Sequence, residues 1–236
     1  MASSTTHLFR ASDHANDSKS HLLLACSGSV ATIKLPQILS SLSAHPSLSI
    51  RVILTPSASK FLAGQSAEQP HLSSLLSIGN VDAIYHDEDE WSPAWTRGAP
   101  MLHIELRRWS DILVVAPLSA NTMAKMVAGM SDSLLLSVLR VWDTSGMVEG
   151  RESPKRVVVC PAMNTAMWRH PVTRGQLAVL EGERGVENGG WVEVLRPVEK
   201  ELACGDVGDG AMREWREVVE VIEQRLGLKK GKAAVE

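Results

Sequence analysis

Cysteine is scarce in this 236-residue sequence, which contains only Cys26, Cys160 and Cys204. Three scattered cysteines cannot form the disulfide framework of a small secreted protein, and no pair has the CxxC or Cys/His spacing of a zinc site. We therefore expect no bound metal and a reducing, intracellular setting.

Long apolar runs are absent as well. No stretch approaches the roughly 18 apolar residues that a membrane-spanning helix needs. The first twenty residues are rich in Ser, Thr, His and Asp and lack the apolar segment of a signal peptide. A formal net charge of −3 gives no electrostatic reason to expect nucleic acid or an anionic membrane as a partner. We expect a cytoplasmic protein without either partner.

The composition is that of a soluble globular protein, with 44% hydrophobic and 22% charged residues. A chain of this length can bury one sizeable core, and the spacing of its apolar segments favours a single domain. Residues 1–20 contain nothing that could form a packed core, so we predict a disordered N-terminal tail. The predicted domain covers residues 21–227, and residues 228–236 form a short polar tail.

Short apolar runs that alternate with helical segments predict the fold. Strands are predicted at 22–26, 50–54, 112–116 and 157–160, with weaker ones at 83–85 and 191–195. Helices are predicted up to about residue 43, after 55–57, from 118 through 142, and from 164 to 181, with a polar surface connection at 143–155. The last helix has apolar residues at helical spacing: Trp215, Val218, Val219, Ile222 and Leu226. The pattern indicates a doubly wound α/β domain, Rossmann-like or flavodoxin-like, with one mostly parallel sheet and helices on both faces.

Small and polar residues follow three of the predicted strands. Ser27–Ala31 follow the first strand, Thr55 and Ser57 the second, and Ser119–Thr122 the fourth. Backbone N–H groups and hydroxyls at strand ends can hold a phosphate at the start of a helix. Tight turns and helix capping are the alternative explanations for each segment taken alone. Because three strand ends share the pattern, we favour a nucleotide-like cofactor.

Three chemically reactive side chains lie on three other segments. Asn164 follows the buried run at 157–160, at the edge where open α/β sheets bind ligands. His103 lies beside apolar residues, where a core histidine is the alternative. Cys204 lies in a glycine-rich loop typical of a mobile flap, where an incidental thiol is the alternative.

The sequence resembles the flavin-dependent cysteine decarboxylases, the family of phosphopantothenoylcysteine decarboxylase. The resemblance covers about 21–212 and rests on six segments in the same order: SGSVA (27–31), DEDEW (87–91), HIELRRW (103–109), APLSANT (116–122), PAMN (161–164) with Met167 and Trp168, and LACGD (202–206) with the Gly-Ala-Met that follows. It implies decarboxylation of 4′-phosphopantothenoylcysteine to 4′-phosphopantetheine in coenzyme A biosynthesis.

The resemblance also implies roles for individual residues. It implies catalytic roles for His103 and Cys204, carboxylate binding by Asn164, and a flap over the substrate that includes Ala203 and Met212. FMN is implied at Gly28, Ser29, Val30, Ala31, Thr55, Ser57, Ser119, Ala120, Asn121, Thr122 and Met163. The usual assembly of the family is a trimer, with the site at a subunit interface.

The implied chemistry explains why the cofactor and each of the three reactive side chains are needed. FMN oxidises the thiol-bearing carbon to a thioaldehyde, whose C=S accepts the electrons released when CO₂ leaves, and the reduced flavin then returns the hydride. An imidazole at His103 exchanges protons near neutral pH. The amide of Asn164 holds the carboxylate without adding charge. The thiol of Cys204, mostly protonated at neutral pH, donates the final proton.

Some features depart from the family or leave alternatives open. The family has two basic residues before LACGD, where this chain has Lys200 and Glu201. Segments 143–155 and 182–190 look like surface insertions. Family members also act as inhibitory subunits of a protein phosphatase, or decarboxylate peptidyl cysteines, and some assemblies split the His and the Cys between paralogues. A short C-terminal tail, and all three reactive groups on one chain, favour a self-sufficient homotrimeric enzyme.

Overall fold

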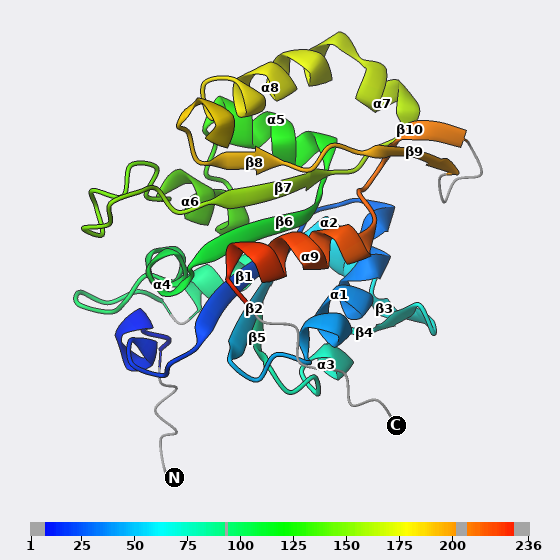
Figure 1. The fold of residues 1–236 in the computed structure, drawn as a ribbon. Coiled ribbons are helices and arrows are strands. Elements are labelled where there is room, and N and C mark those ends of the chain that lie inside the picture. The colour runs from blue at the N-terminus through cyan, green and yellow to red at the C-terminus, as the bar shows by residue number, and fades with distance from the viewer. Residues whose placement is uncertain (1–7, 93, 202–206, 229–236) are drawn as a thin grey trace.

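A six-stranded parallel sheet forms the centre of the molecule (Figure 1). The computed structural model describes residues 8–92, 94–201 and 207–228. The sheet consists of β1 (Ser20–Cys26), β2 (Leu48–Leu54), β5 (Val81–Tyr85), β6 (Ile112–Leu118), β7 (Val157–Pro161) and β8 (Val192–Val194). All six strands predicted from the sequence are confirmed, most with one or two residues more than their apolar runs.

The strand order defines the edge of the sheet at which a ligand is expected to bind. The order is β5-β2-β1-β6-β7-β8, with every neighbouring pair parallel. Numbered along the chain, the sheet strands run 3-2-1-4-5-6, the Rossmann arrangement. The direction of winding reverses between β1 and β6. In such sheets a crevice opens outside the carboxyl ends of the two strands that flank this reversal.

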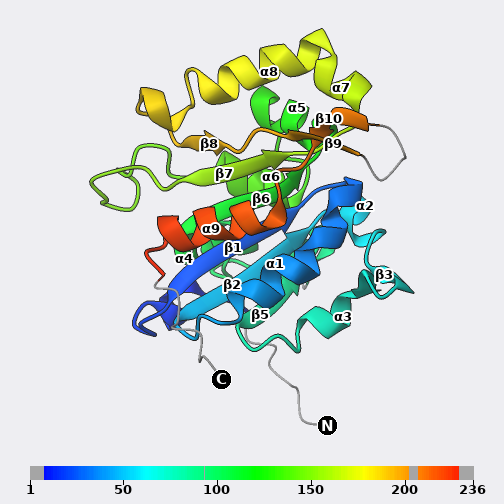
Figure 2. The same cartoon turned by 45° about the vertical axis from the view of Figure 1, so that its right-hand side comes forward.

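Helices cover both faces of the sheet, as predicted (Figures 1 and 2). Leu22 and Leu24 of β1 point to the face covered by α1 (Leu35–Leu42) and α9 (Trp215–Arg225). The intervening Leu23 packs on the opposite face. That face is covered by α4 (Leu102–Trp109), α5 (Ala120–Ala128), α6 (Leu134–Arg140) and α8 (Pro171–Glu181). Both faces are buried, which explains why the strands are continuously apolar. No helix among the described residues is long and apolar enough to cross a membrane.

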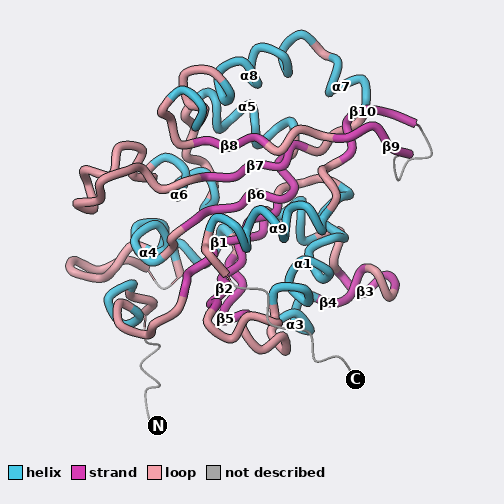
Figure 3. Tube along the Cα trace, in the orientation of Figure 1, coloured by secondary structure: helices cyan, strands magenta, loops and turns pink. Residues whose placement is uncertain are grey.

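Short elements connect and extend these layers (Figure 3). The 3-10 helices are η1 (Ala11–His14), η2 (Val30–Lys34), η3 (Asp87–Trp91) and η4 (Val186–Asn188), and the short α-helices are α2 (Pro56–Ser59), α3 (Leu72–Leu75) and α7 (Thr165–Arg169). Two antiparallel hairpins lie outside the main sheet: β3 (Ala63–Ser66) with β4 (Gln69–His71), and β9 (Val198–Glu201) with β10 (Val207–Ala211).

Two helices predicted as continuous are each divided in two. The region through residue 142 breaks after α5 at Gly129, whose φ of 73° is left-handed. The region from residue 164 to 181 breaks at His170, which is extended with ψ of 137°. A residue that precedes proline is disfavoured in the helical conformation, and Pro171 opens α8.

The chain becomes ordered earlier than predicted. The guanidinium of Arg51 lies 3.9 Å from the ring centroid of Phe9, and Phe9 meets Trp109 edge-on. The N–H of Ala11 donates to Glu105 at 2.8 Å. The prediction of a disordered tail is therefore wrong for residues 8–20. A single aromatic residue and a cation–π contact, instead of an apolar run, hold this segment in place.

The connection at 143–155 is a surface segment, as predicted, but it is anchored by buried charges. Asp143, 1% exposed, accepts the N–H groups of Ser145, Gly146 and Glu149. Burial alone raises the pKa of this carboxyl, but the three N–H donors and the hydroxyl of Ser145 outweigh burial and lower it below its ordinary value. The ammonium of Lys155 is buried and pairs with Glu149 at 2.5 Å. This segment is a folded loop.

Candidate active site

The carboxyl ends of β1 and β6 are joined by one hydroxyl. Ser27 is fully buried, and its Oγ donates to the carbonyl of Pro117 at 3.0 Å. The N–H of Ser119 donates to the same Oγ at 2.7 Å. Ser27 therefore fixes the two loops that flank the reversal of the sheet. The sequence predicts Ser27 only as part of a turn; its position directly after the first apolar run is the signal that distinguishes it.

The loop after β1 also lies against the loop after β2. A Cβ added at Gly28 would lie 2.6 Å from the Cβ of Ser57, so only glycine allows this approach. Ser29, extended at the start of η2, precedes Val30, an apolar side chain that is 44% exposed. Gly28, Ser29, Val30, Ala31 and Ser57, all predicted to bind cofactor, therefore share one edge of the sheet.

Several of the predicted hydroxyls cap helices. Thr55 Oγ1 accepts the N–H of Ala58 at 3.3 Å and caps α2. Ser119 Oγ accepts the N–H of Thr122 at 3.3 Å and donates to the hydroxyl of Thr122 at 3.1 Å. Asn121 is exposed at the start of α5. The N–H groups of Ala120 and Asn121, in the first turn, have no intrahelical acceptor.

This edge suits an organic cofactor that carries a phosphate. The close approach of Gly28 to Ser57 brings the loops after β1 and β2 together, and the start of α5 offers N–H groups and an exposed amide to anionic oxygens. The exposed Val30 offers an apolar surface to a flat ring. Among the described residues, no three His, Cys, Asp or Glu side chains cluster as a metal site. The residues fit a flavin mononucleotide.

The loop after β7 presents a polar amide beside this edge. The N–H of Ala162 donates to the carbonyl of Leu118 at 2.9 Å, which joins the loop to the end of β6. Asn164 is exposed and caps α7, because its Oδ1 accepts the N–H of Met167 at 2.9 Å. With the oxygen fixed, the Nδ2 end of the amide is turned away from the helix. This side chain can donate two N–H bonds to an anionic ligand.

The β9–β10 hairpin packs against the same loop. The N–H of Met163, which is 8% exposed, donates to the carbonyl of Gly210 at 3.0 Å. A Cβ at Gly210 would lie 2.1 Å from the carbonyl oxygen of Met163, so the contact is backbone against backbone. Arg169 of α7 also pairs with Asp209 at 3.1 Å. The predicted flap is therefore partly a hairpin, docked on the loop that carries Asn164.

Two predicted flap residues, Ala203 and Cys204, lie outside the described residues, in the connection between β9 and β10. The third, Met212, follows β10 and is 7% exposed within the core formed with α1 and α9. Met212 fixes the end of the hairpin to the core.

His103, near the start of α4, is paired with a buried carboxylate. Its Nδ1 lies 2.7 Å from Glu90 Oε1, and its backbone N–H donates to Glu90 Oε2 at 3.1 Å. The side chain of Glu90 is 4% exposed and that of His103 is 15% exposed. Glu90 belongs to the DEDEW segment (87–91), and nothing in the sequence predicted a role for it. A pairing across 13 positions leaves no local signal in a sequence.

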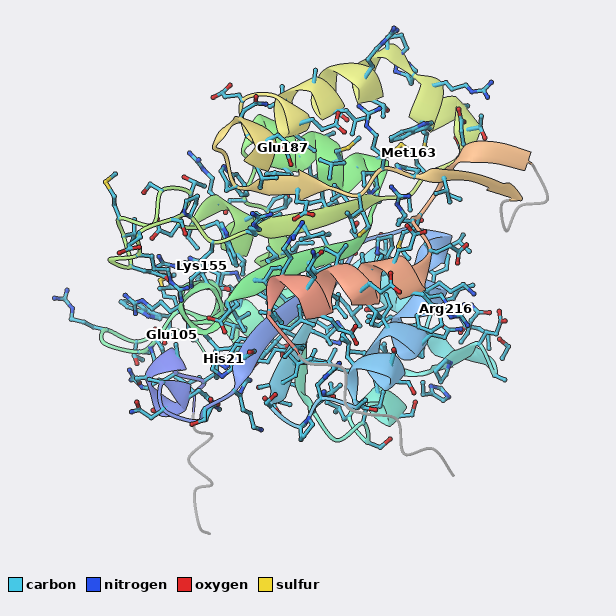
Figure 4. The ribbon with its side chains drawn as sticks, in the orientation of Figure 1. His21, Glu105, Lys155, Met163, Glu187 and Arg216 are labelled. Atoms are coloured by element: carbon cyan, nitrogen blue, oxygen red, sulfur yellow. The ribbon has the colours of Figure 1, made fainter. Side chains whose placement is uncertain are left out.

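Within one chain, His103 lies far from Asn164. Helix α4 packs against η1, η3 and α6, whereas α7 packs against β10 and α8. Figure 4 shows Glu105, on the same helix as His103, at one side of the molecule and Met163, which precedes Asn164, at the other. The chain therefore assembles the cofactor edge and the Asn164 loop together, but not His103.

Comparisons with known sequences find a matching family profile and similar proteins. The profile of the family described as Flavoprotein matches residues 10–227. A phosphopantothenoylcysteine decarboxylase from Mus musculus is 38% identical over 212 residues, which cover 90% of each chain. A probable thymidylate synthase from Schizosaccharomyces pombe is 40% identical over 212 residues, but the chain spans only 30% of that protein. The second likeness concerns one part of a longer protein.

Solved structures show the same fold. A PPC decarboxylase mutant complexed with pantothenoylaminoethenethiol is 38% identical, with a TM-score of 0.69 over 87% of this chain and 97% of that one. The FMN binding protein AtHal3 is 37% identical, with a TM-score of 0.68 over 90% of this chain and all of that one.

Proposed function

This chain belongs to the Flavoprotein family, and we propose that it is an FMN-dependent decarboxylase that converts 4′-phosphopantothenoylcysteine to 4′-phosphopantetheine in coenzyme A biosynthesis. One observation carries the proposal: the exposed amide of Asn164 lies on a loop that is joined to the end of β6 and packed against the β9–β10 hairpin, and among the described residues only its oxygen is engaged. The near full-length likeness to a named decarboxylase supports the substrate. The scarcity of cysteine supports a reducing, cytoplasmic location.

The cofactor edge defines which residues would hold FMN. Gly28, Ser29 and Ser57, with the start of α5 at Ala120 and Asn121, supply backbone N–H groups, hydroxyls and an amide for its polar groups. Bound FMN supplies a transient two-electron oxidation of the substrate carbon that bears sulfur. Thr55, Ser119 and Thr122 support these loops through their caps.

Each reactive side chain then has one task. Asn164 donates N–H bonds to the substrate carboxylate and adds no positive charge that would oppose the departure of neutral CO₂. His103 takes and returns a proton through Nε2, the nitrogen not facing Glu90. Cys204, which lies outside the described residues, donates the proton that completes the product.

We further propose that the site forms between copies of the chain in a homotrimer. The support is the separation of α4 from α7 within one chain. Trp91, next to Glu90, is 65% exposed, and Met167 beside Asn164 is 51% exposed. Large apolar side chains exposed at both half-sites suit burial against another copy.

A turnover assay tests the proposal. Purified protein reconstituted with FMN should be yellow and should release CO₂ from 4′-phosphopantothenoylcysteine faster than from a peptide ending in cysteine. Colourless protein that cannot bind FMN would refute the cofactor. Preference for the peptide would favour a peptidyl-cysteine decarboxylase, and flavin binding without any turnover would favour a regulatory subunit.

Complementation tests the shared site. His103→Asn and Asn164→Asp are each expected to be inactive alone. When the two variants are co-expressed in equal amounts, each mixed trimer contains one intact site, with His103 from one chain and Asn164 from its neighbour. With random mixing, about a quarter of all sites are then intact, so about a quarter of the wild-type turnover should return. No recovery in mixed trimers of verified composition would place both residues in one chain's site.

A further inference from the structure

We propose that Glu90 is a positioning residue that selects the tautomer and orientation of His103. The proposal rests on the proposed function, in which His103 transfers a proton. It starts from the carboxylate of Glu90, which is nine-tenths or more buried and contacts one residue through both of its oxygens.

The first oxygen selects the tautomer. An ionised carboxylate only accepts hydrogen bonds, so the nitrogen 2.7 Å from Oε1 must carry a proton. That nitrogen is Nδ1 of His103. In the neutral imidazole, Nε2 is then left with its lone pair, ready to accept a proton from the substrate. When Nε2 accepts the proton, the charge that forms on the ring faces the buried carboxylate.

The second oxygen fixes the backbone of the same residue. Oε2 accepts the N–H of His103 at 3.1 Å. This N–H belongs to the first turn of α4, where the N-cap Met101 offers no side-chain acceptor. A negative charge at a helix N-terminus is also favourable. Glu90 therefore holds both the ring and the start of the helix, so neither can rotate independently.

Glu90 is itself held by a braced turn. The N–H of His86 donates to Asp89 at 2.7 Å, and the N–H of Leu134 in α6 donates to Asp87 at 2.9 Å. These bonds fix both the start of η3 and its distance from α6. Within the described part of the chain, His103 is the one basic group paired with Glu90. Because His103 is its single basic partner, the buried carboxylate of Glu90 interacts directly with any positive charge that forms on the ring of His103.

A cavity makes the pairing accessible to a chemical test. A space of about 530 Å³ borders Glu90 and is also lined by Phe9, Tyr85, Trp95 and Leu102. Formate is small enough to enter it. In a Glu90→Ala variant, formate can occupy the position of the missing carboxylate and restore the acceptor at Nδ1.

The experiment compares Glu90→Ala and the isosteric Glu90→Gln with Glu88→Ala, which removes an exposed carboxylate from the same turn. We expect kcat of Glu90→Ala to fall about 10- to 100-fold with little change in KM. Glu90→Gln keeps a hydrogen-bond acceptor without the charge, so its kcat should fall less than that of Glu90→Ala. Glu88→Ala should match the wild type. Formate should raise kcat of Glu90→Ala only.

Nitrogen NMR supplies a readout independent of turnover. The His103 signals, identified by their loss in His103→Asn, should show a single Nδ1–H tautomer in the wild type and a mixture in Glu90→Ala. Wild-type kcat in Glu90→Ala, or an unchanged tautomer, would overturn the positioning role. If the wild type itself has no turnover, the proposed function fails, while the tautomer still decides the pairing.

Discussion

Asn164→Asp separates the two tasks of this side chain. The aspartate keeps an oxygen where Asn164 Oδ1 accepts the N–H of Met167, so α7 remains capped. It replaces the outward N–H₂ with a second oxygen that carries charge. The variant therefore removes the carboxylate donor and leaves the fold in place. Asn164→Ala removes both functions.

The size of each effect follows from the geometry. Loss of a hydrogen bond to a charged group costs about 1.5–3 kcal/mol. Two carboxylates about 4 Å apart repel by about 1 kcal/mol in water and about 4 kcal/mol near a protein surface. With about 1.4 kcal/mol for each tenfold change, kcat/KM of Asn164→Asp should fall at least about 50-fold. Its free energy of unfolding should stay near the wild-type value, whereas Asn164→Ala should lose about 1 kcal/mol with its cap.

Two measurements on the same preparations check this reasoning. Steady-state CO₂ release gives kcat/KM, and urea unfolding gives the free energy of unfolding. Wild-type kcat/KM in Asn164→Asp would refute carboxylate binding by Asn164. A loss of stability in Asn164→Asp as large as that in Asn164→Ala would refute the cap, and with it the inferred direction of the amide.

Three further predictions concern the rest of the molecule. His103→Asn should lower CO₂ release about 10²- to 10⁴-fold without changing the assembly measured by size-exclusion chromatography, and substantial residual turnover would exclude His103 from proton transfer. Gly28→Ala should retain less flavin per chain by absorbance after dialysis, because its Cβ would meet Ser57 at 2.6 Å, whereas Gly79→Ala, with no atom within 4 Å, should retain it fully. Burial raises the pKa of Glu193, but the hydrogen bonds and charges of Arg225 and Arg156 outweigh burial and hold it below the ordinary value of 4.5. The stability from these ion pairs is therefore present above pH 4.5 and lost as the pH falls through the lowered pKa. Lowering the pH should therefore reduce the free energy of unfolding, followed by circular dichroism, more for the wild type than for Glu193→Gln. An equal loss of stability in the wild type and in Glu193→Gln would show that these ion pairs do not cause the acid sensitivity.

The sheet was predictable because its information is local. Parallel strands buried on both faces must be continuously apolar, and runs such as Val157–Cys160 show this directly. The β9–β10 hairpin was not predictable in the same way. Its strands pair with each other outside the sheet, and the segment 207–211 contains two glycines and no apolar alternation. What holds it is backbone contact between Gly210 and Met163, which composition does not encode.

The N-terminal segment and the pairing of Glu90 with His103 were missed for a related reason. Phe9 is held by Arg51 and Trp109, more than forty positions away in each case. Neither a lone aromatic residue nor a lone carboxylate has a period that a sequence window detects. Motifs show which residue types are present at a site, whereas these partners are selected by tertiary contact.

The polar residues at the strand ends were predicted either to cap helices or to bind a ligand. In the structure some side chains can do both, whereas others can do only one. A carboxamide has an acceptor end and a donor end, so Asn164 can cap α7 and still bind an anion. Ser119 has one hydroxyl proton, which it gives to Thr122 while its oxygen accepts a backbone N–H. Its side chain is therefore engaged within α5. We therefore predict that a cofactor at this edge contacts the backbone N–H groups of the first turn and the exposed amide of Asn121. Mutation of Ser119 should affect these contacts only indirectly, by loosening the start of the helix.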